Sequence, residues 1–202
     1  MKLYWHPFSV FPRRIRIALR EKGMAHEEVL VDLPGGALRS PEFLRRNPFG
    51  QVPVLEDGAT VISESIAILE YLEERQPSPA LLPRDPERRA LARQLMLWSG
   101  DYLAPAWKAW LAPRFDPTIA PNDPTVQQGH HNLTTHLDVL EPRLEGNDYL
   151  VGDYSLADIC YAPFITTFDL IGLTDVLDQH PRVRAWEQRL QHRPAVKATT
   201  PS

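Results

Sequence analysis

The spacing of apolar and polar positions changes partway along the chain. Short apolar runs alternate with helical patterns over roughly the first 75 residues, whereas only helical patterns follow after about residue 85. A proline-rich stretch separates the two regions and is typical of a stiff linker. We therefore expect two domains, at residues 1–76 and 86–202, joined by a linker at residues 77–85.

The first region is predicted to be an α/β domain with the element order β-α-β-α-β-β-α. Its last helix places Ile66, Leu69 and Leu72 on one face, and Asp57-Gly58 is a strong signal for a hairpin between its last two strands. The expected strands lie at residues 2–5, 27–33, 52–56 and 60–62, and the expected helices at residues 13–22, 41–46 and 63–75.

The second region is predicted to be an all-α helical bundle. Asp85-Pro86 is a typical helix start, and Ser155 with Asp158 has the spacing of a capping box at the beginning of a buried central helix. Apolar stripes at helical spacing indicate the bundle core. They are Leu91, Leu95, Trp98 and Tyr102, then Val126, Leu133, Leu137, Leu140 and Leu144, and finally Val183, Trp186 and Leu190.

Composition narrows the class of protein. With 43% apolar and 24% charged residues the chain is an ordinary globular protein, and its formal charge of −4 disfavours a nucleic-acid binder. Its apolar runs are too short for a membrane span, and MKLYWHPF lacks the sections of a secretory signal, so we expect a cytoplasmic protein with no membrane association. Cys160, the one cysteine, should be a buried core thiol, and no metal site is expected.

The loop at residues 5–12 joins the first strand to the first helix, where α/β folds present ligands to a helix amino terminus. The Ser9 hydroxyl could donate a hydrogen bond to a thiolate there, and the helix dipole would further lower the pKa of a bound thiol. Ser9 could instead only cap the helix. His6 is a possible base, although a lone histidine is more often structural. The run RRIR at residues 13–16 is expected to be a solvated helix face that could attract an anion locally.

Two further segments offer ligand-binding chemistry. A cis Val52–Pro53 bond would leave the main-chain N–H and C=O of Val52 facing outward, able to pair with an extended peptide, and a trans turn is the alternative. Glu64 and Ser65 open a helix and together offer an acceptor for an ammonium and donors for a carboxylate, as an amino-acid head group requires. Simple helix capping is the other interpretation of this pair.

Four segments, in order and over essentially the whole chain, resemble the cytosolic glutathione transferase superfamily. LYWHPFSVFPRRIRIALREKG is similar to its first strand, catalytic loop and first helix, and RNPFGQVPVLEDG to its cis-proline segment. SESIAILEYL is similar to its glutathione head-group helix, and YLVGDYSLADI to the capping box of its central carboxy-terminal helix. The resemblance implies a thioredoxin-like first domain, a helical second domain, and a bacterial-type member of a serine-type class, phi-like or theta-like.

The resemblance also implies roles for individual residues. Ser9 would stabilise the thiolate of glutathione, which acts as co-substrate. Tyr4 is the rival activator, because other classes use a tyrosine at the end of the first strand, but its early position indicates a core residue. Leu38 and Ile66 stand where phi-like members often carry histidine and arginine. The implied glutathione contacts are Arg39, Gln51, Val52, Pro53, Glu64 and Ser65.

The implied activity is detoxifying transfer of glutathione to a small hydrophobic electrophile by a homodimeric enzyme. A non-catalytic glutathione-binding or ligand-binding module, and a glutathione-dependent dehalogenase or lyase, are the alternatives. A glutaredoxin-like reductase is disfavoured because the loop has no thiol, and a maleylacetoacetate isomerase because its serine and cysteine motif is missing. The expected electrophile pocket consists of Phe8, Val10, Phe11, Trp107, Trp110 and Phe115.

Overall fold

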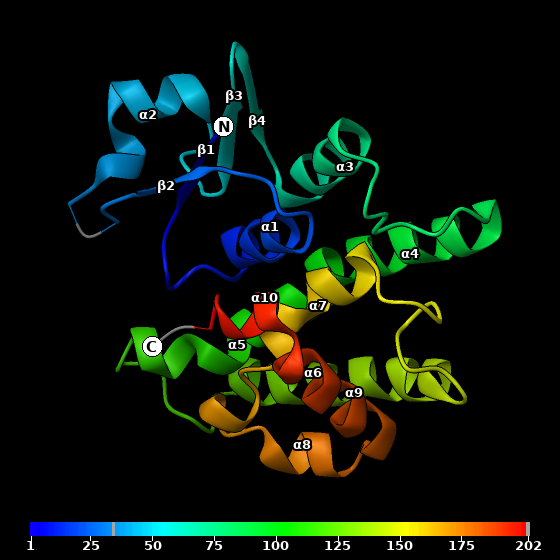
Figure 1. Cartoon of the computed structure of the whole chain (residues 1–202). Coiled ribbons are helices and arrows are strands. Elements are labelled where there is room, and N and C mark those ends of the chain that lie inside the picture. The colour runs from blue at the N-terminus through cyan, green and yellow to red at the C-terminus, as the bar shows by residue number, and fades with distance from the viewer. Residues whose placement is uncertain (34, 201–202) are drawn as a thin grey trace. The chain divides into compact units, whose positions relative to one another are not determined.

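The computed structural model describes residues 1–33 and 35–200. The chain divides into two compact units (Figure 1). The first unit comprises Met1–Leu81 together with the segment that begins at Arg193, and the second comprises Leu82–His192. In the described part of the chain, every helix is too short or too polar to cross a membrane.

A four-stranded mixed sheet forms the centre of the first unit. The strand order is β2-β1-β3-β4, with β1 and β2 parallel and the other two pairs antiparallel. Tyr4 pairs with Val54, and Leu3 with Leu55, so the two pairs point to opposite faces of the sheet. The strands are β1 (Lys2–Trp5), β2 (Glu27–Leu30), β3 (Val54–Asp57) and β4 (Thr60–Ser63).

Helices cover both faces of this sheet. Figure 1 shows α2 on one side and α1 with α3 on the other. Phe43 of α2 packs against Val31 and Val54, and its ring meets the edge of Tyr4. On the opposite side α1 packs against α3 and buries Ile15 completely. The helical elements are α1 (Val10–Glu21), η1 (Ala37–Arg39), α2 (Pro41–Arg46), α3 (Ser65–Arg75) and α10 (Pro194–Lys197).

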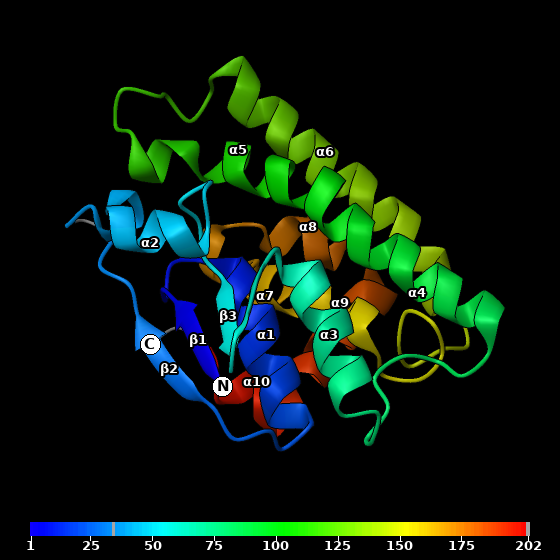
Figure 2. The same cartoon turned by 90° about the horizontal axis from the view of Figure 1, so that it is seen from above.

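The element order predicted for this domain is confirmed, while some boundaries differ. β3 begins at Val54, two residues later than expected, because Pro53 has no N–H for the strand ladder. The last helix of the domain begins at Ser65 rather than Ser63, since Ser63 still pairs with Val54 in the sheet. Figure 2 shows the strands of this sheet side by side, with α1 and α3 next to them.

The second unit is all helical, as the sequence predicts. Ser155 and Asp158 form the expected capping box at the start of α7, and all ten residues of this helix are buried, including Cys160. Asp158 also accepts hydrogen bonds from Leu150 N–H and Trp186 Nε1, which ties α7 to α9. The elements are α4 (Pro86–Trp98), the π-helical turn η2 (Ser99–Leu103), α5 (Ala104–Phe115), α6 (Pro124–Leu140), η3 (Glu141–Leu144), α7 (Leu156–Ile165), η4 (Asp169–Ile171), α8 (Thr174–Asp178) and α9 (Pro181–His192).

The segment after α9 groups with the first unit, although the sequence placed residues up to 202 in the helical domain. Arg193 forms a bidentate ion pair with Glu21 at the end of α1, with both N–O distances 2.8 Å. Farther along, Arg13 Nη2 donates to the Thr200 hydroxyl at 3.2 Å. These long-range contacts, which a linear pattern does not show, hold α10 against α1.

Candidate functional site

Ser9 is the N-cap residue of α1 and has an extended backbone, with φ −106° and ψ 119°. Its N–H donates to the carbonyl of His6 at 3.0 Å, but its side chain makes no capping hydrogen bond. Among the described residues the Ser9 hydroxyl has no hydrogen-bond partner. The hydroxyl is therefore available to hydrogen-bond with a ligand at a helix amino terminus, where the partial positive charge favours an anion.

The two rival activators near this loop have other partners. Nδ1 of the buried His6 accepts a hydrogen bond from Phe8 N–H at 3.3 Å, so this nitrogen supports the loop. The Tyr4 hydroxyl donates to Glu56 Oε2 at 2.9 Å, and Arg46 lies over its ring at 5.0 Å. Burial, together with the hydrogen bond to Glu56, raises the pKa of Tyr4, so its proton is held at neutral pH.

The Val52–Pro53 peptide bond is cis. Asn47 shapes the preceding turn, since its Nδ2 donates to the Gln51 carbonyl at 2.8 Å and its Oδ1 accepts from Phe49 N–H at 3.1 Å. The main-chain N–H and C=O of Val52 make no hydrogen bond with any residue that the structure describes. Val52 therefore offers one donor and one acceptor to an extended peptide.

Arg39 approaches this same turn from η1. Gly50 has φ 62°, and a Cβ built on it would lie 2.8 Å from the Leu38 carbonyl oxygen and 3.0 Å from Arg39 Nη1. There is no room for a side chain at Gly50, and the positive φ also favours glycine. This close approach brings the exposed Arg39 guanidinium beside the segment that leads into Gln51 and Val52.

Glu64 has the one positive φ of a non-glycine residue in the described part of the chain, with φ 72° and ψ 114°. Such a backbone costs about 1–3 kcal/mol and is typical of functional sites. Glu64 is the N-cap of α3, yet its exposed side chain makes no capping bond, which leaves the amino terminus of α3 open to a ligand. The neighbouring Ser65 is buried, and its Oγ accepts a hydrogen bond from Arg14 Nη1 at 3.2 Å.

The arginine run on α1 is not the solvated face that the sequence indicated. Arg13 and Arg14 are both at least 96% buried. Arg14 points toward the amino terminus of α3. Arg13 and Arg16 line a cavity of about 170 Å³, and Ser9 is a further lining residue of this cavity. The remaining lining residues are Trp5, His6, Pro7, Thr199 and Thr200.

The six side chains expected around the electrophile lie in different settings. Phe8 is 78% exposed and Phe115 72% exposed. Trp110 donates from Nε1 to the Ile171 carbonyl at 2.9 Å, so its polar atom has a structural role. Trp107 meets Phe164 edge to face, and its buried Nε1 has no hydrogen-bond partner in the described part of the chain. Val10 and Phe11 directly follow Ser9 at the start of α1 and are partly buried.

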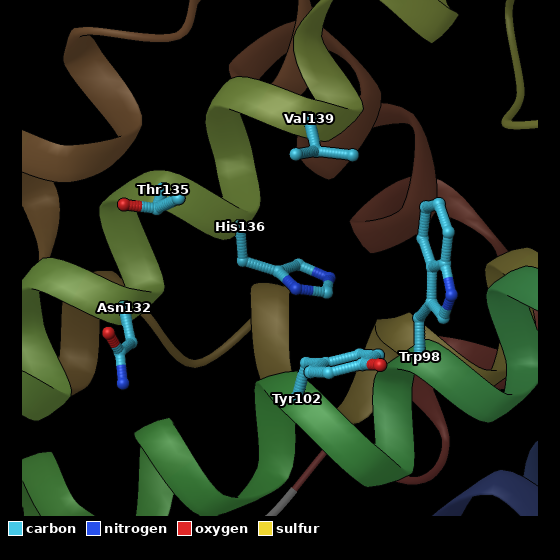
Figure 3. A pocket seen from close by; sticks show the side chains of 6 residues that line it. All are labelled: Trp98, Tyr102, Asn132, Thr135, His136 and Val139. Carbon is cyan, nitrogen blue, oxygen red and sulfur yellow. The ribbon is translucent and has the colours of Figure 1, made fainter.

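A second cavity, of about 440 Å³, lies in the helical unit, and its lining residues are not among those predicted to bind a ligand. Figure 3 shows His136 and Val139 of α6 facing Trp98 of α4 and Tyr102 of η2, with Asn132 and Thr135 completing the lining. Tyr102 was expected in the bundle core but is 63% exposed. The π turn at η2 explains the difference, since the extra residue per turn rotates the side chains relative to α-helical spacing.

No group of three or more histidine, cysteine, aspartate or glutamate side chains is arranged to hold a metal ion within residues 1–33 and 35–200. Among the described residues of the first unit, unpaired polar groups lie in the loop at Ser9, in the cis-proline segment at Val52 and at the start of α3. The sequence predicts all three as binding segments, whereas it did not predict the burial of Arg13 and Arg14.

Comparison with known proteins gives matches to both units. The family model for the glutathione S-transferase N-terminal domain matches residues 8–75, and that for the glutathione S-transferase C-terminal domain matches residues 104–194. Glutathione S-transferase F10 of Arabidopsis thaliana is 35% identical over 95% of this chain and 92% of its own length. Glutathione S-transferase 3 of Zea mays is 35% identical over 98% of this chain and 92% of its own length.

Solved structures agree with these matches. Glutathione transferase F7 from Populus trichocarpa superposes with a TM-score of 0.88 at 29% identity, covering 98% of this chain and 96% of that chain. A structure of glutathione S-transferase-I bound with the ligand lactoylglutathione gives a TM-score of 0.86 at 32% identity, covering 98% and 97% of the two chains.

Proposed function

Because this chain belongs to the glutathione S-transferase family, we propose that it binds glutathione in its first unit and uses the Ser9 hydroxyl to activate the thiol. The chain is a glutathione transferase. The observation that carries the proposal is the uncommitted Ser9 hydroxyl at the amino terminus of α1. A serine that only capped the helix would direct its oxygen to its own N2 or N3 amide, and Ser9 does not.

Activation requires the bound thiol to ionise at neutral pH. A cysteine-like thiol has a pKa of about 8.5, and lowering it to about 6.5 needs about 2.7 kcal/mol of extra stabilisation of the thiolate. One charge-assisted hydrogen bond from a hydroxyl together with a helix amino terminus can supply this amount. Tyr4 does not compete for the role, because its hydroxyl already donates to Glu56.

The tripeptide is held along the remaining segments. The main chain of Val52 pairs with the cysteinyl unit in the manner of an added strand, with Pro53 fixing the turn. Glu64 accepts from the α-ammonium of the γ-glutamyl end, while Ser65 and the open amino terminus of α3 receive its carboxylate. Arg39 and Gln51 lie toward the glycyl end.

The thiolate then attacks an electrophilic carbon of the co-substrate. In a displacement a carbon–sulfur bond forms as the bond to the leaving group breaks. In an addition the resulting carbanion takes up a proton. Phe8, Val10 and Phe11 provide apolar contacts beside the reacting sulfur, since they flank Ser9 in the chain. We assign this activity to cytoplasmic detoxification of small hydrophobic electrophiles.

The functional form is a homodimer. Several large apolar side chains of the helical unit are exposed in the single chain, among them Leu97, Tyr102 and Val139. These three come from α4, η2 and α6, and two of them line the 440 Å³ cavity of Figure 3. A partner subunit would remove this apolar surface from water. Sedimentation of the wild-type protein and of a Tyr102→Glu variant, which should shift toward monomer, tests the proposal.

The activation step is tested by ultraviolet absorbance of bound glutathione thiolate against pH. The wild-type protein should titrate well below pH 8.5. Ser9→Ala should shift the midpoint upward by about one unit while glutathione still binds, because the helix amino terminus remains. Ser9→Thr, which retains a hydroxyl, should keep most of the lowering. A midpoint that stays low in Ser9→Ala would rule out Ser9 as the activator.

A further inference from the structure

The cavity beside Ser9 is built mainly from one face of α1. Ser9, Arg13 and Arg16 follow one another at spacings of four and three residues, which places them on the same side of a helix. All three line the 170 Å³ cavity, and none of the described residues that line it is an aspartate or a glutamate. The cavity therefore presents positive charge next to the hydroxyl that holds the thiolate.

Arg16 is fixed in place as a rigid donor. Its guanidinium lies 3.8 Å from the centre of the Trp5 ring, and its Nε donates to Glu28 Oε1 at 3.0 Å. Within the described residues its two Nη groups have no hydrogen-bond partner. A guanidinium that is held by stacking and by Nε loses little further freedom when its Nη groups bind a planar anion.

Arg16 shares its carboxylate partner with a neighbouring arginine of α1. Glu28 Oε1 accepts from Arg20 Nη1 at 3.0 Å as well as from Arg16, so two arginines share one carboxylate. Arg13 is 96% buried and lies close enough to Arg16 to be affected by its charge. Burial, with a contribution from Arg16, lowers the pKa of Arg13 to about 10, and the side chain stays charged at neutral pH. An anion in the cavity would relieve this repulsion.

The two threonines of the cavity do not supply the donors. The Thr199 hydroxyl is directed to the Ala195 and Val196 carbonyls, and the Thr200 hydroxyl to the Val196 carbonyl. Thr200 also accepts from Arg13 Nη2. Thr199 and Thr200 thus close the cavity, while the arginines determine which ligand it takes.

We infer that this cavity binds the carboxylate of the co-substrate, so that the enzyme prefers small electrophiles that carry a carboxylate group near the reacting carbon. The inference rests on the proposed role of Ser9, because Ser9 places the glutathione sulfur at the same cavity. A carboxylate fits the planar, two-donor edge of Arg16. Arg16 is thereby assigned as a specificity-determining residue for the transfer reaction.

A matched pair of substrates tests the preference. 4-Chloro-3-nitrobenzoate and its methyl ester react at the same carbon, where a carbon–sulfur bond forms and chloride leaves, and they differ in one negative charge. The readout is the ratio of kcat/KM for the acid to that for the ester. Arg16→Met should lower this ratio about tenfold. Arg16→Lys, which keeps the charge but not the planar pair of N–H donors, should lower it less.

Arg20→Met is the matched control. It removes the same charge from the same helix and the same contact with Glu28, but Arg20 does not line the cavity. Its acid-to-ester ratio should remain that of the wild-type protein. An unchanged ratio in Arg16→Met, or an equal fall in both variants, would overturn the inference. Any preference for the acid would then come from the overall electrostatic field of the basic residues of α1.

A binding measurement separates this inference from the activation step. Calorimetric titration with 3-nitrobenzoate and with its methyl ester needs no turnover. The wild-type protein should bind the acid more tightly than the ester. Arg16→Met should lower the ratio of the ester Kd to the acid Kd about tenfold. Equal binding of acid and ester by the wild-type protein would overturn the cavity assignment, whereas failure of the Ser9 titration alone would leave the carboxylate preference standing.

Discussion

Arg14 Nη1 donates to the hydroxyl oxygen of Ser65 at 3.2 Å and so connects α1, which follows the loop of Ser9, to the first turn of α3. Arg14 is 99% buried and also lies over the Phe11 ring at 4.8 Å. The bond fixes the Ser65 side chain at the amino terminus of α3. Since Ser65 accepts from Arg14, its own proton stays available for a ligand carboxylate.

Replacement of Arg14 by methionine should therefore weaken glutathione binding without changing thiol activation. Methionine preserves much of the apolar stem but leaves Ser65 without its donor, and the loss of a hydrogen bond to a charged group predicts a 5- to 20-fold higher Kd, or about 1–2 kcal/mol. Calorimetry gives the Kd, and thiolate absorbance gives the pKa of the bound thiol. A raised thiol pKa in Arg14→Met would contradict the separation of the two roles, and circular dichroism checks that the variant is folded.

The strained backbone at Glu64 predicts a trade-off between stability and binding. With φ 72°, the native conformation suits glycine better than glutamate, so Glu64→Gly should be more stable than Glu64→Ala by about 1 kcal/mol. Both variants lose the carboxylate and should bind glutathione at least tenfold more weakly. Urea unfolding gives the first quantity and calorimetry the second.

Glu64→Gln is the control for charge, because it keeps the side-chain length and the strain. Its affinity for glutathione should fall nearly as far as that of Glu64→Ala, since the ammonium loses an anionic partner. Tight binding by both Gln and Ala variants would show that the α3 amino terminus alone holds the γ-glutamyl end. A glycine variant less stable than the alanine variant would contradict the strain argument.

Local sequence signals were sufficient to predict several features of the fold. The capping box of Ser155 and Asp158, the Asp57-Gly58 hairpin and the first-turn Pro41 each involve residues within a few positions of one another, so their geometry is encoded locally. The same holds for the position of Ser9 between β1 and α1. The element order and the position of the Ser9 loop in the fold could therefore be predicted.

Features that depend on residues far apart in the chain could not be predicted from the sequence. Arg13 and Arg14 look solvated in a run of arginines, but their partners Thr200 and Ser65 lie 187 and 51 residues away. The isomer of the Val52–Pro53 bond was open in the sequence and is cis in the structure. The exposure of Tyr102 depends on a π turn that a period of 3.6 residues does not anticipate. In each case tertiary structure decided the outcome.

The buried His136 of the helical unit predicts a loss of stability in mild acid. Its Nε2 lies 2.9 Å from the Tyr161 hydroxyl, and burial lowers the pKa of His136 to about 4, below the ordinary value of about 6.5. Between these values the unfolded chain binds more protons than the folded one. The free energy of unfolding therefore rises with pH in this window and falls as the pH drops from about 6.5 to about 4.

The size of this contribution is about 2–3 kcal/mol, and His136→Gln should remove it, because glutamine can still bond with Tyr161 but does not titrate. Urea unfolding at several values between pH 4.5 and pH 7, followed by tryptophan fluorescence, measures the difference in slope between the two proteins. His192→Gln replaces an exposed histidine of the same unit and is the matched control. Equal slopes for His136→Gln and the wild-type protein would mean that other groups, such as carboxylates paired in the folded state, account for the acid sensitivity.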